Sequence, residues 1–323
     1  MSPFIFIQLI LTGAIRSGTS VLYAVLGETV SEKAGVVNLG TEGCMLMGAC
    51  VGFIVTFQTG NPWLGVLAGG LAGGVLSLAH GYLVIECGAN QLASGLAILF
   101  FGLGLTALIG RDYVKQNIVG FDPIQIPILS DLPFFGPILF KHDIMTYVGF
   151  LIAPLLWFLM YRTQWGLSLR AVGESRSAAF STGRNPGRIA YTAIFIGGVL
   201  SGLGGAQLSV AFTHFWVENM TQGAGFIAVA LVIFGMWHPI RAITGALIYG
   251  GAYSLQLQLQ TMGVGVSPFL LQMLPYVLTL VVLLAFGKAS RRAMPSELGL
   301  AFRREIAAPR KFRTPWVRAK AGD

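Results

Sequence analysis

The feature that most constrains this chain is a series of apolar stretches of about 20 residues that contain no charged side chain. A helix of that length crosses the hydrocarbon core of a bilayer. Only 11% of the 323 residues are charged and 54% are hydrophobic, whereas soluble domains contain about 25% charged residues. The 43 glycines are also typical of membrane helices, whose backbones approach closely. The sequence therefore predicts an all-α, polytopic helical membrane protein.

The expected membrane segments are separated by two long polar interruptions. The apolar stretches are 3–30, 36–57, 63–86, 91–110, 145–161, 189–213, 224–237, 241–258 and 268–287. Arg16 interrupts the first stretch, which predicts an interfacial helix at 4–15 followed by a span from about residue 18. The stretch 224–237 is too short to cross alone, which indicates a half-helix or re-entrant piece. We expect about 8–10 transmembrane segments, including broken or re-entrant helices.

The distribution of charge predicts the orientation of the chain. Residues 162–188 contain five basic residues and one acid, and residues 288–323 contain ten of the 21 Lys and Arg residues. Residues 111–144 contain three basic and four acidic residues. Because basic segments stay in the cytoplasm, we expect 162–188 and the C-terminus inside and 111–144 outside. We expect one transmembrane domain over 1–290 and a basic cytoplasmic tail over 291–323.

Several other classes of protein are disfavoured. The net charge of +8 does not indicate nucleic-acid binding, because the basic residues flank apolar spans and form no recognisable module. Cys44, Cys50 and Cys87 fit neither a disulfide framework nor a metal site. The N-terminus lacks the basic region and cleavage site of a signal peptide. No His/Asp/Glu cluster or Ser/His pair indicates a membrane enzyme.

The polar segment RAVGESRSAAFSTGRNPGR, residues 170–188, lies between two apolar spans. Ser175 to Phe180 favour a short helix with small residues on one face, and Gly183 with the following Asn-Pro-Gly turn ends it. Such a segment is either an ordinary solvated loop or a protruding element to which another protein binds.

The pattern GExxxAAxxxG in this segment resembles the coupling loop of ABC importer permeases, which docks in a groove of the ATPase subunit. Further motifs resemble the simple-sugar and nucleoside branch of these permeases, which includes ribose-type and, more distantly, branched-chain amino-acid permeases. They are SEKAGVVNLGTEGCMLMGA (31–49), GANQLASGLA (88–97), ENMTQGAGFIAVALVIFGMWHP (218–239) and RAITGALIYGG (241–251), in collinear order over about 30–290. Two positions depart from the family pattern, because Ala224 and the pair Glu86-Cys87 stand where basic residues are expected.

The resemblance implies a fold like that of type II ABC importer permeases and a set of partners in a bacterial inner membrane. Those partners are an ABC ATPase, a second permease subunit (identical or paralogous), an external solute-binding protein and membrane lipids, with no nucleic acid. ATP and Mg²⁺ would bind the ATPase, so we expect no cofactor on this chain, which also lacks a P-loop motif. The motif set favours nucleosides or related purine and pyrimidine compounds over free sugars. The implied ATPase-coupling residues are Arg170, Gly173, Glu174, Ala178, Ala179 and Gly183.

Polar and aromatic side chains within the matching motifs are candidates for the substrate pathway. They are Asn38, Glu42, Asn90, Gln91, Phe215, Trp216, Glu218 and Asn219. Asn38 and Glu42 share a face if they are helical, and they line the pathway or instead cap and lock a broken helix. Asn90 caps a helix or contacts solute. Trp216 either lines the pathway or belongs to an interfacial aromatic belt. Glu218 either lies in the permease interior or forms a structural ion pair.

A secondary transporter driven by protons or sodium is the competing class. Such a protein needs coupling carboxylates near the midplane, in halves related by a repeat. Glu28, Glu42 and Glu218 could serve, but no matched pair of interrupted helices flanks one site. Uptake without any ATPase would favour this class.

Overall fold

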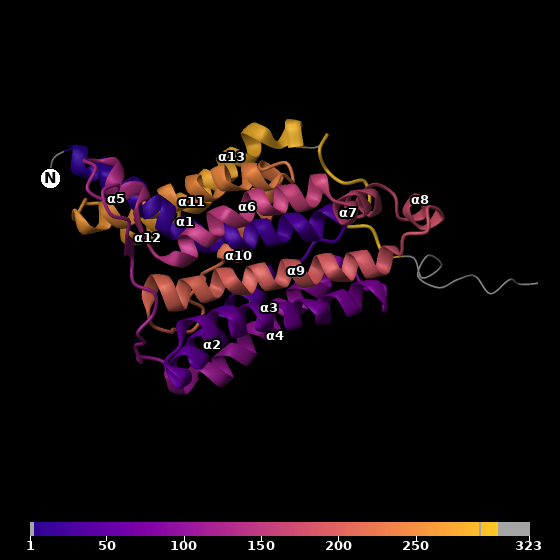
Figure 1. Cartoon of the computed structure of the whole chain (residues 1–323), viewed down its shortest axis with the longest axis horizontal. Helices are drawn as coiled ribbons and strands as arrows, with labels where there is room; N and C mark the ends of the chain where they lie inside the picture. Colours follow the sequence, from indigo (N-terminus) through magenta and orange to yellow (C-terminus); the bar gives the residue numbers. More distant parts are fainter. Residues whose placement is uncertain (1–2, 291, 303–323) are drawn as a thin grey trace, which may run out of the picture.

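The computed structural model describes residues 3–290 and 292–302, which are mostly helical (Figure 1). Along the chain its elements are α1 (Pro3–Lys33), α2 (Thr41–Thr59), α3 (Pro62–Ile85), α4 (Gln91–Gly110), η1 (Arg111–Tyr113), β1 (Ile124–Gln125), α5 (Phe135–Leu139), β2 (Lys141–His142), α6 (Ile144–Arg162), α7 (Gln164–Glu174), α8 (Arg176–Ser181), α9 (Pro186–Ala206), η2 (Gln207–Thr213), α10 (Ala224–Phe234), α11 (Pro239–Thr261), α12 (Pro268–Gln272) and α13 (Leu274–Ser290).

Seven helical segments within the described residues are long and apolar enough to cross a membrane. They are α1, α2, α3, α4 with η1, α6, α9 with η2, and α12 with the first part of α13. Helix α10 has only 11 residues and follows the irregular stretch 214–223, as expected for a broken helix. Helix α11 has 23 residues and packs along α1. The prediction of a polytopic helical membrane protein with a broken segment is confirmed.

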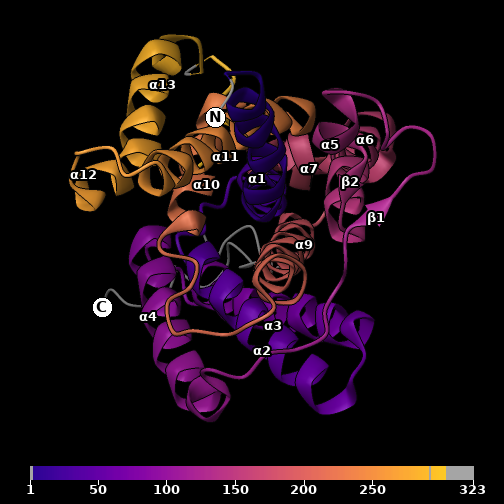
Figure 2. The ribbon, with the colours of Figure 1, turned by 90° about the vertical axis from the view of Figure 1, so that its left-hand side faces the viewer.

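The helices form two groups around a central pair (Figure 2). Helices α2, α3 and α4 lie on one side, α11 and α13 lie on the other, and α1 and α9 lie between them. Glycines allow the central contacts. A Cβ atom at Gly27 would lie 2.5 Å from the carbonyl oxygen of Gly197, so a side chain at this crossing of α1 and α9 is excluded. The window of α12 and α13 is the least buried of the seven.

The two ends of the bundle differ in structure. Helices α5 and α12 lie at one end, and α7 and α8 lie at the other (Figure 1). Residues 111–144 run across the α5 end, and their regular structure is limited to η1, the short helix α5 and an antiparallel pairing of β1 with β2. Residues 292–302 pass along the α8 end, where Glu297 bonds to Gly173 of α7 and Phe302 packs near α3 and α9.

The short helix expected at Ser175 to Phe180 is present as α8 (Arg176–Ser181), whereas two other expectations are wrong. Helix α1 is continuous through Arg16. The Arg16 guanidinium lies 5.1 Å from the centre of the Phe212 ring, and this cation–π contact offsets its burial. Residues 292–302 are packed against the bundle, so the expected tail does not begin at 291. Residues 303–323 lie outside the described part of the chain.

Candidate functional site

A cavity of about 120 Å³ lies between α1, η2, α11 and α13 and the stretch before α10. Its wall mixes aromatic rings with amide and hydroxyl groups. The polar and aromatic lining residues are Arg16, Ser17, Ser20, Gln207, Phe212, Thr221, Gln222, Tyr249, Tyr253, Gln256, Gln272 and Tyr276. Mixed walls of this kind bind small organic solutes, because rings supply contact area and a few polar groups fix orientation.

Gln207 is the most unusual residue of this wall. Its side chain is fully buried, yet neither the amide nitrogen nor the amide oxygen has a hydrogen-bond partner within the described residues. Gln207 is also the first residue of η2, a π-helix that continues α9, and π-helical turns occur often at functional sites. A buried amide with both hydrogen-bonding ends free is available to a solute or to water.

Glu42 fixes the broken helix beside the cavity. Its carboxylate accepts hydrogen bonds from the Thr221 hydroxyl (2.6 Å) and from the backbone N–H groups of Gly223 (2.8 Å) and Gly225 (2.6 Å). The carboxylate therefore caps the N-terminus of α10, where the free N–H groups favour a negative charge. A Cβ atom at Gly225 would lie 2.5 Å from the backbone of Glu42. This geometry matches the structural alternative for Glu42, a lock on the break, and a place for Glu42 on the substrate pathway stays a prediction.

Asn38 and Glu42 would share a face only if both were helical, and Asn38 is not in a helix. It lies in the loop before α2, and its side-chain oxygen accepts a hydrogen bond from the Gly40 N–H (2.9 Å). The carboxylate of Glu28 accepts hydrogen bonds from the Asn38 N–H (2.7 Å) and the Thr41 hydroxyl (2.9 Å). A buried acid on α1 thus holds this loop.

Asn90 and Gln91 lie at the α8 end and are not among the residues that line the cavity. Asn90 caps α4 by accepting from the N–H groups of Leu92 and Ala93. The Gln91 side chain accepts from the Val37 N–H (2.8 Å) and donates to the carbonyl oxygens of Gly35 (3.3 Å) and Leu300 (2.9 Å). The plain explanation for Asn90, a helix cap, matches the geometry.

The aromatic motif after η2 is divided between the surface and the core. Trp216 is fully buried against Leu46, Cys50 and Phe53, so it belongs neither to an interfacial belt nor to the cavity wall. Phe215, Glu218 and Asn219 are exposed on the described chain. Their role in the pathway, like that of Asn38, Asn90 and Gln91, stays a prediction.

The predicted coupling residues lie together on α7, α8 and the turn after them. Glu174 and Ala178 are exposed, whereas Gly173 and Ala179 are buried. Gly173 approaches the Lys33 carbonyl oxygen so closely that any side chain would clash. Gly183, with φ +80°, provides the left-handed turn after α8, and the guanidinium of Arg170 lies 5.0 Å from the centre of the Tyr161 ring.

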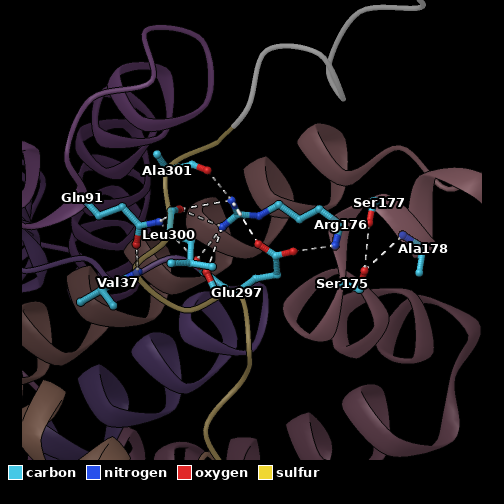
Figure 3. Close-up of polar contacts among 10 residues, drawn as sticks. Val37, Gln91, Ser175, Arg176, Ser177, Ala178, Glu297, Leu300 and Ala301 are labelled. Carbon is cyan, nitrogen blue, oxygen red and sulfur yellow. Dashed lines mark hydrogen bonds and ion pairs between the residues drawn. The ribbon is translucent and has the colours of Figure 1, made fainter.

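Two polar residues that are prominent in the structure are not predicted from the sequence. Gln207 lies in an apolar run and gave no signal beyond being polar within a span. Arg176 is 2% exposed and donates to the carbonyl oxygens of four residues (Figure 3). Its one signal was its position as a basic residue inside the GExxxAAxxxG pattern.

Comparison with known proteins assigns the chain to a family. Residues 9–285 match the family described as branched-chain amino acid transport system / permease component. No solved structure matches the chain significantly. The chain is 37% identical over 322 residues to the putative glucose ABC transporter permease protein TsgC13 of Haloferax volcanii, covering 92% of this chain and 98% of the relative.

Two other relatives carry names that refer to nucleosides. The guanosine ABC transporter permease protein NupQ of Bacillus subtilis is 33% identical over 302 residues, covering 88% of this chain and 93% of the relative. The nucleoside ABC transporter permease protein NupC of Lactococcus lactis is 31% identical over 297 residues, covering 88% and 94%. The chain therefore belongs to this permease family and is a multi-pass transport component of the ABC class.

Proposed function

We propose that this chain is the membrane-spanning subunit of an ATP-driven importer whose energy comes from a separate ATPase. Three features support the proposal: the family, the absence of a P-loop motif from the sequence, and the exposure of Glu174 and Ala178 on α7 and α8. An exposed short helix between two membrane helices is a suitable grip for a partner that must move the bundle.

The proposed assembly lies in a bacterial inner membrane. Two permease subunits, identical or paralogous, form the path, and one ATPase binds the α8 end of each. A solute-binding protein docks outside on residues 111–144. The basic 162–188 segment and the C-terminus then face the cytoplasm, in agreement with the positive-inside rule. ATP-driven closure of the ATPases draws the α8 helices together and alternates access to the cavity.

The proposed cargo is a nucleoside or a related purine or pyrimidine compound. The observation that carries this choice is the free amide of Gln207 in a wall that also contains Tyr249, Tyr253 and Tyr276. Aromatic rings stack on a flat heterocycle, and an amide pairs with the donors and acceptors of a base edge. The printed names of NupQ and NupC, guanosine and nucleoside permeases, agree with this cargo.

A simple sugar is the second candidate, because TsgC13 is a putative glucose permease and is 37% identical. Sugars also bind between aromatic rings and amides. A branched-chain amino acid is disfavoured. Its ammonium group needs an anionic partner when it is buried, and among the described lining residues of the cavity none is Asp or Glu.

The ATPase partnership is tested by co-purification from cells that express the complete transporter. The double variant Glu174→Lys with Ala178→Trp should lose the ATPase while the permease stays folded. The control Glu86→Lys reverses an exposed charge at the C-terminus of α3 and should keep the ATPase. Retention of the ATPase by the double variant would contradict the proposed grip. Uptake that persists without any ATPase would instead favour an ion-coupled transporter.

The cargo is tested by calorimetry on the purified solute-binding protein, followed by uptake of labelled guanosine and labelled glucose. We expect guanosine or another nucleoside to bind and to be taken up. Binding of glucose alone would overturn the nucleoside proposal and leave the ATP-driven mechanism intact.

A further inference from the structure

Arg176 connects α8 to neighbouring segments of the chain. Its guanidinium donates from Nη1 to the carbonyl oxygens of Leu300 (3.2 Å) and Ala301 (3.0 Å). From Nη2 it donates to those of Gly35 (3.1 Å), Glu297 (3.1 Å) and Leu300 (3.2 Å) (Figure 3). Arg176 therefore binds two separate parts of the chain at once, the residues after α1 and the residues after α13.

We name residues 292–302 the C-terminal strap. The Glu297 carboxylate accepts from the Arg176 backbone N–H (3.2 Å), and its other oxygen lies 3.7 Å from Nη1. The guanidinium lies 3.8 Å from the centre of the Phe302 ring. Burial lowers the pKa of the Arg176 guanidinium, and the Glu297 carboxylate partly restores it. An arginine side chain stays protonated at physiological pH, so the contacts of the Arg176 guanidinium with the strap persist across that pH range.

The strap is also fastened to α7, α1 and α4. The Glu297 N–H donates to the Gly173 carbonyl oxygen (2.8 Å), and the Ser296 hydroxyl donates to the Glu174 carboxylate (2.9 Å). Lys33 donates to the carbonyl oxygen of Ala293 (3.3 Å), and Gln91 donates to that of Leu300 (2.9 Å). The strap thus connects the predicted coupling helices to the ends of two membrane helices.

From Gly35 the contacts continue to the cavity. The loop after Gly35 leads to Asn38, which is held by Glu28. Thr41, also bonded to Glu28, precedes Glu42, and Glu42 binds Thr221 in the cavity wall. This sequence of contacts is a continuous physical route from α8 to the cavity, and measurement must establish that energy passes along it.

We propose that Arg176 is a positioning residue that makes the C-terminal strap a working part of the coupling unit. By holding the strap and Gly35 together, Arg176 makes the 34–38 loop follow any displacement of α8. The inference rests on the proposed ATP-driven function, because it assigns a role in transmitting the movement that the ATPase imposes. The guanidinium is needed for this role, because a lysine ammonium has three donors from one point and cannot reach the same spread of carbonyl oxygens.

The first test measures uptake and ATP hydrolysis in the same proteoliposomes, which contain the complete transporter with its ATPase and binding protein. Arg176→Met should lower the solute taken up per ATP hydrolysed by about tenfold, a typical size for coupling between sites. Arg176→Lys should lie between Arg176→Met and the wild type. The matched control is Arg241→Met, since Arg241 is exposed and bonds only to Met236 among the described contacts.

The ratio of uptake to hydrolysis separates positioning from folding. A purely structural role would lower uptake and hydrolysis together, in proportion to the amount of assembled complex, and would overturn the inference. An unchanged ratio in Arg176→Met would also overturn it. If the wild-type complex shows no ATP-driven uptake, the proposed function fails first, and the two failures are distinguishable.

A second test asks whether the strap and α7 move as one unit. Glu174→Cys with Ser296→Cys, in a Cys87→Ser background, replaces two side chains that touch at 2.9 Å. Cys44 and Cys50 are buried. Because Glu174 also belongs to the proposed ATPase contact, the oxidised and reduced forms of this variant are compared with each other and not with the wild type. Once non-reducing electrophoresis shows the disulfide, we expect the oxidised and the reduced protein to take up the same amount of solute per ATP hydrolysed. Uptake that stops on oxidation and returns on reduction would show that the strap must separate from α7, and would overturn the inference. The single variant Glu174→Cys controls for the loss of the carboxylate.

Discussion

The α8 end and the cavity each contain a buried polar side chain, and the two side chains differ in their hydrogen bonding. On α8, Arg176 donates to the carbonyl oxygens of four residues, three of them in the C-terminal strap, whereas in the cavity wall both amide atoms of Gln207 lack a partner among the described residues. A buried polar group without a partner costs about 1–3 kcal/mol. The paired Arg176 side chain holds elements together, and we propose that the unpaired Gln207 amide serves to bind a solute. Glu42, which has three donors, belongs with Arg176.

Substitutions at four positions test this difference, and their effects on the free energy of unfolding should decrease in a definite order. The largest effect is expected at Glu42. Glu42→Ala leaves the buried Thr221 hydroxyl, the buried Gly225 N–H and the partly buried Gly223 N–H without an acceptor, which should destabilise the protein by about 3 kcal/mol or more. Denaturant unfolding in detergent measures the loss. Glu42→Gln keeps an acceptor but presents its NH₂ to a donor, so it should be intermediate. Wild-type stability of Glu42→Ala would show that this carboxylate does not hold α10.

The second largest loss of stability is expected at Gly225 of α10, which packs against the backbone of Glu42. Gly225→Ala adds a Cβ atom that would lie 2.5 Å from the Glu42 backbone, and overpacking of this kind costs about 1–3 kcal/mol. Gly104→Ala is the matched control, because a Cβ atom there meets nothing within 4 Å and alanine favours the α4 helix. Thermal unfolding of both variants checks the prediction. Equal melting temperatures for the two variants would count against a tight junction between α2 and α10.

A smaller effect is expected at Asn90. Asn90→Ala removes the cap of α4 and should cost about 1 kcal/mol. The KM for uptake should not change, because Asn90 lies outside the cavity wall. Uptake kinetics and thermal unfolding of the same variant measure both quantities. A raised KM would place Asn90 on the pathway after all.

The smallest effect on stability, with a large effect on transport, is expected at Gln207. Gln207→Met keeps the volume and removes a buried amide that has no partner, so the unfolding free energy should stay within about 0.5 kcal/mol of the wild type or rise. The KM for the transported solute should rise about tenfold, as expected when a hydrogen bond to a solute is lost. Marked destabilisation with an unchanged KM would mean that Gln207 serves the fold, and the contrast with Arg176 would disappear.

The sequence predicted those parts of the molecule that depend on local chemistry. The membrane spans, the cap at Asn90 and the turn at Gly183 follow from apolar length, from side-chain capping and from the backbone freedom of glycine. The family resemblance, drawn from motifs spread over about 30–290, is confirmed by the match over 9–285.

The remaining features depend on contacts between distant residues. Glu42 bonds to residues 179–183 positions away, and Arg176 bonds to carbonyl oxygens 121–141 positions away. Backbone carbonyl and N–H groups are the same in nearly every residue, so no pattern of side chains marks them as partners. At Arg16 the sequence predicted a break in the first helix, because a charge lies within an apolar stretch. The helix is continuous there, and the Arg16 side chain contacts the Phe212 ring, which lies far away in the sequence.

The most direct test of the account places a photo-crosslinking amino acid at Ala178 of α8 in cells that express the complete transporter. The control position is Gly265, which is exposed in the stretch between α11 and α12, and where a side chain meets nothing within 4 Å. We predict a covalent adduct with the ATPase from position 178 and none from position 265. An adduct with the ATPase from position 265 and none from 178 would contradict the proposed orientation and the coupling role of α8.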